Sequence, residues 1–227
     1  MRGETGARIV GVSPRPSCQR GSASAGACLA ILASVIEGIK TIARRTLPTS
    51  MYGPLRARRV RRFIASYEPR TVRHDYAGFA LLVRLEDPLG EGWYDRDWDE
   101  PAEISQLRGG RLRTGAAVFD IGAHQGIVAL ILARIVGERG RVIAVEAEPH
   151  NVRVARNNVA ANEIRNVTIL HAAVGATNGT LSFIESLNGR VAPRGRPGAI
   201  DVPATTVDAI AVEYGHTDVV LIDVEGF

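Results

Sequence analysis

The chain contains little cysteine and no long apolar segment. Cys18 and Cys28 are the only cysteines among 227 residues, and neither has the neighbours that a disulfide framework or a metal site requires. No run of eighteen apolar residues is present, so the sequence offers no bilayer-spanning helix. These absences favour a globular protein of a reducing compartment, and we expect it in the cytoplasm without stable membrane insertion.

Lysine is also scarce: Lys40 is the single example, and every other basic residue is arginine, which we interpret as the codon bias of a GC-rich bacterial genome. Residues 1–75 carry a net charge of +10 from 14 basic and 4 acidic residues, against −6 for the remainder. The segment "RARRVRRF" (56–63) has one aromatic residue and no nucleic-acid motif, so it favours a solvated helix face with Val60, Phe63 and Ile64 on one side. We therefore predict no nucleic-acid partner.

The first fifty residues lack the composition and the periodicity of a folded domain. Residues 1–24 are rich in Gly, Ser, Pro and Arg, and the apolar run 25–36 resembles a signal-peptide core but lacks a clean cleavage site. A short amphipathic helix is the other interpretation of that run. We predict that 1–50 is a disordered or non-native extension that adds nothing to the fold, with Met51 as an alternative start.

Residues 51–115 are expected to form a helical or lid segment. The stretch 78–87, "GFALLVRLED", predicts a strand or a hairpin. Trp93, Tyr94 and Trp98 then precede a helix that starts near Asp99 or Pro101. These aromatic residues either line a substrate pocket or pack a lid onto the core.

Beyond residue 115 strands and helices alternate. Apolar strands are predicted at 116–122, 141–148, 166–175 and 218–224, a short extra strand at 179–186, and helices at 125–136 and 149–162. Strands that are apolar on both faces and alternate with helices indicate an α/β fold with a doubly wound, mostly parallel sheet.

The turn after the first of these strands carries the chemistry. Asp120 ends the strand, and Gly122 and Gly126 let the backbone turn sharply and leave space beside a ligand. A dinucleotide site would have a glycine where His124 stands, which argues against NAD or FAD. A cofactor without a pyrophosphate but with positive charge, which Asp120 would offset, fits better, and S-adenosylmethionine is such a ligand. Glu146, at the end of the second strand, suits the two ribose hydroxyls.

The stretches "VFDIGAHQG", "VIAVEAEPHNVRVARNNVAANEIRNVTILHAAVG", "VPATTVDAI" and "VVLIDVEG" resemble the FkbM family of class I S-adenosylmethionine-dependent methyltransferases. The resemblance covers about residues 93–226 and implies that 116–227 is a Rossmann-like cofactor domain. It also implies O-methylation of a hydroxyl on a sugar, glycolipid or other natural product. Carried over by position, the expected cofactor residues are Asp120, Gly122, Ala123, His124 and Gly126 around the methionine, Glu146 at the ribose, and Ala147 and Ala172 beside the adenine. His124 replaces the commoner asparagine.

Asp223, at the tip of the fourth strand, is the expected catalytic residue facing the methyl group and the acceptor. It would take the hydroxyl proton, or hold a divalent metal with Glu225; no third ligand is evident, so we predict no metal site. His124 is the alternative base. His171 is expected to be a satisfied core histidine, and His150 to cap the second helix or face solvent.

Three further expectations concern the whole chain. The alternatives to a methyltransferase are an NAD(P)-binding oxidoreductase and a non-catalytic remnant of the same fold. In the class I strand order 3-2-1-4-5-7-6, the strands beyond the fourth would follow Phe227, so we expect a C-terminally truncated enzyme of doubtful activity. Residues 218–224 would then form an exposed sheet edge. The acceptor and the oligomeric state are not predicted.

Overall fold

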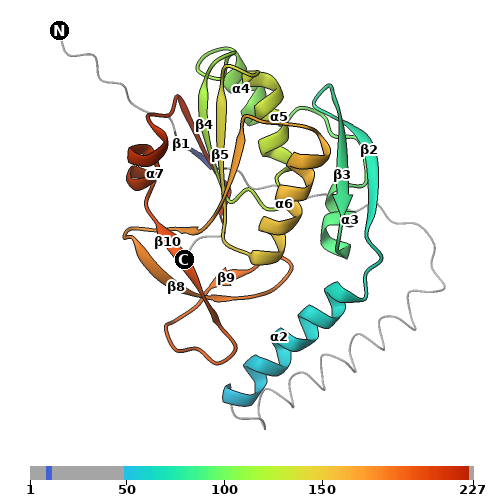
Figure 1. Cartoon of the computed structure of the whole chain (residues 1–227), viewed down its shortest axis with the longest axis vertical. Helices are drawn as coiled ribbons and strands as arrows, with labels where there is room; N and C mark the ends of the chain where they lie inside the picture. Colours follow the sequence, from blue (N-terminus) through green and yellow to red (C-terminus); the bar gives the residue numbers. More distant parts are fainter. Residues whose placement is uncertain (1–8, 12–48, 225–227) are drawn as a thin grey trace.

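A parallel sheet forms the centre of the computed structural model, which describes residues 9–11 and 49–224, with side chains from residue 53 (Figure 1). The order of its strands is β1-β11-β4-β5-β6, all parallel. Their bounds are β1 Ile9–Gly11, β4 Ala117–Ile121, β5 Arg141–Glu146, β6 Val167–His171 and β11 Val219–Ile222. The predicted α/β class and parallel sheet are confirmed, and β6-β5-β4-β11 reproduces the 3-2-1-4 part of the class I order.

The N-terminal segment contributes to this sheet. Ile9–Gly11 pairs in parallel with Val220–Ile222, so β11 does not form the sheet edge along these three residues. The expectations of an exposed edge at 218–224 and of an N-terminus that adds nothing to the fold are therefore wrong for this strand. The physical reason is that an apolar strand with open backbone donors and acceptors pairs with any extended segment that reaches it.

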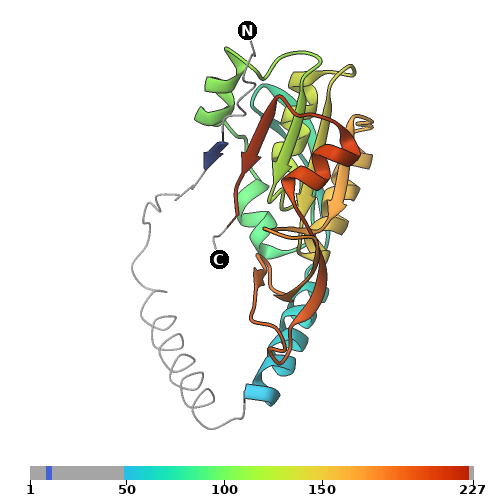
Figure 2. The same cartoon turned by 90° about the vertical axis from the view of Figure 1, so that its left-hand side faces the viewer.

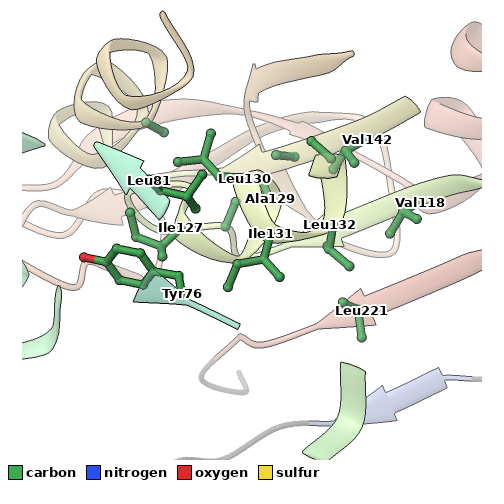
Figure 3. Packing of buried hydrophobic residues seen from close by; sticks show 14 of the residues in the cluster. Tyr76, Leu81, Val118, Ile127, Ala129, Leu130, Ile131, Leu132, Val142 and Leu221 are labelled. Carbon is green, nitrogen blue, oxygen red and sulfur yellow. The ribbon is translucent and has the colours of Figure 1, made fainter. Parts of the chain in front are cut away.

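Helices cover both faces of the sheet. On one face lie α5 (Ile127–Val136) and α6 (Pro149–Ala161), and on the other α7 (Val207–Tyr214). Alternate residues of β4 divide between the two cores: Val118 packs under α5, and Phe119 packs towards α7. Figure 3 shows the larger core, where Leu130 and Leu132 of α5 meet Val118 and Val142 of the sheet.

The strand β3 (Phe79–Leu85) of the lid segment packs over the outer side of α5 and α6 (Figure 1). The lid segment comprises α2 Thr49–Ala65, the antiparallel hairpin of β2 Arg70–Tyr76 and β3, α3 Pro88–Tyr94 and α4 Ala102–Arg108. The strand expected within 78–87 is confirmed as β3, and the helix near Pro101 is confirmed as α4, but β2 and α3 are additions. Asp87 caps α3 and Pro88 occupies its first position, a combination that favours a helix start.

A second, smaller sheet follows β6. Its order is β7-β10-β8-β9, with β7 Ala173–Val174, β8 Gly179–Ile184, β9 Arg190–Val191 and β10 Ile200–Thr205. The short extra strand expected at 179–186 is confirmed as β8. Cys18, Cys28, the apolar run 25–36 and Glu225 lie outside the described residues. In the part that is described, no helix is both long and apolar enough to cross a membrane.

Candidate active site

The loop between β4 and α5 has the backbone shape that its glycines permit. Gly122 has φ +90° and Gly126 has φ +83°. A Cβ atom on Gly122 would lie 2.2 Å from the carbonyl oxygen of Asp223, and one on Gly126 would lie 3.1 Å from the Cβ of Ala155. A side chain at Gly122 would therefore collide with the residue after β11, and one at Gly126 would crowd α6. That the two glycines adjoin a ligand stays a prediction.

Asp120 is a buried acid without a complete set of partners. Its side chain lies at the carboxyl end of β4 and is 4% exposed, and Oδ2 has no hydrogen-bond partner. Burial, together with the negative charges of Asp223 and Glu146, raises the pKa of Asp120 to about 7. A buried, unpaired carboxyl oxygen is costly, so this atom marks a place where a cation or a hydrogen-bond donor would be stabilising.

Glu146 lies at the end of the neighbouring strand β5. Oε2 accepts the backbone N–H of His124 at 2.9 Å, and Oε1 accepts that of Glu148 at 2.7 Å. Burial raises the pKa of Glu146, and the N–H donors oppose this. The side chain therefore joins the β4–α5 loop to the β5–α6 loop.

His124 stands at the top of the glycine turn in an uncommon backbone conformation, with φ +50°. Its Nδ1 lies 2.8 Å from the Tyr94 hydroxyl, its Nε2 lies 3.4 Å from the Leu187 carbonyl, and its ring centroid lies 4.9 Å from that of Trp93. Burial lowers the pKa of His124 to about 4. The ring is therefore neutral at pH 7 and a weak base, which disfavours the alternative of His124 as catalytic base.

The remaining expected site residues lie at the same edge of the sheet. Ala147 follows Glu146 directly, and the N–H of Ala172 donates to the Glu146 carbonyl at 3.0 Å. Asp223 follows β11, its side chain is exposed, and its N–H donates to the Ile121 carbonyl at 2.9 Å. The fold thus brings all of the predicted positions together at the carboxyl ends of β4, β5, β6 and β11, where ligands bind in sheets of this kind.

The histidines behave differently from one another. His171 Nε2 lies 3.2 Å from the Ala147 carbonyl and the residue is half-buried, in keeping with a satisfied structural histidine. His150 neither caps α6 nor faces solvent, because its Nε2 lies 2.8 Å from Oδ2 of Asp87 and its side chain is only 9% exposed. Our expectation for His150 is therefore wrong: an acid in the lid, distant in sequence, binds this ring.

Two buried polar residues near the site were missed. Glu148 accepts the N–H of Ser186 at 3.0 Å, and burial raises its pKa to about 7. Asn151 donates to the Leu187 carbonyl at 3.3 Å, but its Oδ1 has no partner. The segment around Leu187 thus covers the start of α6. The proline-led helix start at 149 indicated where the polar groups would gather, but nothing in the sequence connects it to residues 186–187.

No group of three or more His, Cys, Asp or Glu side chains that would hold a metal ion occurs among the described residues. The pairing of Asp223 with Glu225 lies partly outside them. The polar groups at this edge would suit an organic cation. They are one carboxyl oxygen without a partner and one carboxylate that accepts two N–H groups, with small residues around them.

The sequence over residues 120–227 matches the model of the methyltransferase FkbM domain. This part of the chain is therefore similar to the methyltransferases of the FkbM family. The recognition by motif is thereby confirmed, and the match begins at Asp120, one residue before the end of β4.

Curated methyltransferases match shorter stretches of this chain. A probable cobalt-precorrin-6B C(15)-methyltransferase of Sulfolobus acidocaldarius is 39% identical over 71 residues, 31% of this chain and 37% of the relative. A protein-L-isoaspartate O-methyltransferase of Methanococcoides burtonii is 36% identical over 61 residues, 27% of this chain and 30% of the relative. The matched stretch thus spans less than two fifths of these relatives' length.

A solved structure is similar as well. The S-adenosylmethionine-dependent methyltransferase of Aquifex aeolicus is 28% identical, with a TM-score of 0.29 over 37% of this chain and 42% of that chain. At this TM-score the fold assignment rests on the strand order of the sheet itself.

Proposed function

We propose that this methyltransferase transfers a methyl group from S-adenosylmethionine to a hydroxyl oxygen of a sugar, glycolipid or other natural product. The observation that carries the cofactor part is the orphaned Oδ2 of Asp120, buried at the carboxyl end of β4. When bound, S-adenosylmethionine supplies a methyl group on a positively charged sulfur that leaves readily. A cation near Asp120 would stabilise the ionised carboxylate and lower a pKa that now stands at about 7.

Glu146 supports a ribose next to that cation. Each of its carboxylate oxygens accepts one backbone N–H, and each keeps a further lone pair. Two such oxygens match a vicinal diol. Ala147 and Ala172 lie beside Glu146, and their small side chains would adjoin the adenine ring.

The hydroxyl acceptor requires a base but little other help, because alignment with the methyl group supplies much of the acceleration. Asp223 is the proposed base. It is exposed at the end of β11, beside the cofactor loop, and its charge contributes to the raised pKa of Asp120. The curated relatives are named for a cobalt-precorrin and for protein isoaspartate, so the choice of a hydroxyl rests on the FkbM resemblance.

Titration calorimetry of the purified chain with S-adenosylmethionine and, separately, with NAD tests the cofactor. We expect S-adenosylmethionine to bind and NAD not to bind, because His124 replaces the middle glycine of a dinucleotide turn. Glu146→Gln keeps one oxygen acceptor and should weaken S-adenosylmethionine by about 1.5–3 kcal/mol. Binding of NAD alone would assign the site to the oxidoreductases instead.

Transfer of a labelled methyl group to a panel of sugars, glycolipids and carboxylates tests the acceptor. Asp223→Asn should lower kcat at least about a hundredfold for a hydroxyl acceptor while leaving the Kd for S-adenosylmethionine within about twofold. Labelling of carboxylates alone would refute the hydroxyl assignment, and an unchanged kcat in Asp223→Asn would refute the role of Asp223.

A further inference from the structure

Helix α2 projects beyond the body of the molecule along much of its length (Figures 1 and 2). It contains five arginines between residues 56 and 62 and no acidic residue. It also carries two of the large apolar side chains that the described part exposes most, Leu55 at 53% and Phe63 at 50%. Apolar side chains left in water on a strongly basic helix are not explained by the packing of this chain.

The exposed apolar and basic side chains share one face. Leu55, Arg59, Arg62 and Phe63 follow the spacing i, i+4, i+7, i+8, which places them along one stripe of the helix. All four are exposed. On the opposite side Ala57 is buried, and Val60 and Ile64 line a pocket that residues 148–150 of the body also line. One apolar side chain thus lies at each end of a basic stripe that faces away from the protein.

Among the described residues, no acidic side chain pairs with the arginines of this stripe, Leu55–Arg59–Arg62–Phe63. Arg61, on the body side, forms the one ion pair of α2 found there, with Glu185 at 2.6 Å. The face that points outward has no such neighbour among residues 53–224.

A second element extends the basic surface. Gly53 lies against the loop 193–199 so closely that a Cβ atom on it would be 1.8 Å from the Pro197 carbonyl oxygen. The same loop exposes Arg194 and Arg196. The N-terminal end of α2, with Arg56 next to it, and this loop therefore lie at the same end of the molecule.

We propose that this end of the protein docks on an anionic lipid surface, with α2 lying in the plane of the headgroups. Leu55 and Phe63 would enter the boundary between headgroups and acyl chains, and the arginines would bind lipid phosphates. The apolar side chains of the stripe favour a lipid surface over a nucleic acid. On a nucleic-acid backbone Leu55 and Phe63 would stay in water, whereas a lipid surface buries them. The contact is peripheral, and it is independent of which acceptor the active site takes.

Co-sedimentation of the full chain with vesicles tests this proposal. We expect binding to mixed phosphatidylglycerol–phosphatidylcholine vesicles and little binding to phosphatidylcholine alone. Arg59→Glu with Arg62→Glu should reduce the bound fraction about tenfold or more. Leu55→Ser with Phe63→Ser should reduce it severalfold without any change in charge.

The matched control is Arg111→Glu with Arg139→Glu, which makes the same charge change at two exposed arginines elsewhere. It should keep binding within about twofold, and circular dichroism spectra should show that all variants fold. Equal loss in the control, equal binding to neutral vesicles, or no loss in Leu55→Ser with Phe63→Ser would overturn the proposal. Tight binding of a DNA duplex that the serine variant retains in full would assign the stripe to nucleic acid.

Discussion

Asp87 and Asp120 are two buried carboxylates with opposite surroundings. Asp87, in the lid, is fully buried and accepts four hydrogen bonds: from the N–H groups of Leu89 and Gly90, from Gln125 Nε2 at 2.6 Å, and from His150 Nε2 at 2.8 Å. Asp120, at the cofactor edge, is 4% exposed and leaves Oδ2 without a partner.

The two acids differ in pKa for the same reason. Burial alone would raise the pKa of Asp87, but the hydrogen bonds from His150, the Gly90 N–H and Gln125 hold it below its ordinary value. Burial and two neighbouring acids raise the pKa of Asp120 to about 7. A buried acid whose lone pairs are satisfied by the protein holds the fold together, whereas one left unsatisfied is arranged for a ligand.

Of the substitutions that test this comparison, Asp87→Ala should change the free energy of unfolding most. It leaves two backbone N–H groups, one buried amide and one buried imidazole without an acceptor, so we expect a loss of about 3–5 kcal/mol in the free energy of unfolding. Urea denaturation measures it. Asp99→Ala, at an exposed acid, is the control and should change stability by less than about 0.5 kcal/mol. A loss no larger than that in Asp87→Ala would show that the network is dispensable.

Asp120→Asn should act in the opposite direction in the absence of cofactor. Because the folded pKa of about 7 exceeds the unfolded value of 3.8, the contribution of Asp120 to stability is fully present below the unfolded pKa. It is lost as the pH rises through about 7. An amide has no such titration, so at pH 8 the variant should be more stable than the wild type by about 2 kcal/mol.

Asp120→Asn also tests whether Asp120 pairs with a bound cation. S-adenosylmethionine should bind the wild type more tightly at pH 8 than at pH 6, because the cation favours the ionised Asp120. Asp120→Asn should bind weakly at both values and lose this pH dependence. Calorimetry at the two pH values measures it, and a wild-type affinity that does not change with pH would contradict the pairing of Asp120 with a cation.

Tyr94→Phe should give the smallest of these effects. It removes the hydroxyl 2.8 Å from His124 Nδ1 and should cost about 1–2 kcal/mol of stability, with a severalfold weaker Kd for S-adenosylmethionine, because His124 holds Glu146 through its backbone N–H. Tyr76→Phe is the matched control. Its hydroxyl donates to the Tyr94 carbonyl at 2.5 Å, so stability should fall similarly while the Kd stays the same. Equal Kd values in both variants would show that the Tyr94–His124 contact does not position the cofactor loop.

The sequence predicted the sheet well because its strands are apolar on both faces and its helices start at clear boundaries. Asp120 and Glu146 were identified from the ends of such strands, since parallel strands bring their carboxyl ends to one edge. His150 was misjudged, because its partner Asp87 lies 63 positions earlier in the chain. The helix α3 was missed although Asp87 and Pro88 are a common helix start.

What the sequence alone determined is the order of β4, α5, β5, α6 and β6, together with the family motif, because local periodicity and turn residues decide these elements. The tertiary structure decided which buried acid is satisfied and which is not. It also decided that Gly122 makes room for the end of β11 and that Ile9–Gly11 pairs with that strand. Each of these depends on atoms that lie far apart in the chain, such as Asp87 and His150 at 63 positions. A hydrogen bond or a close approach at that range leaves no trace in the local pattern of residues.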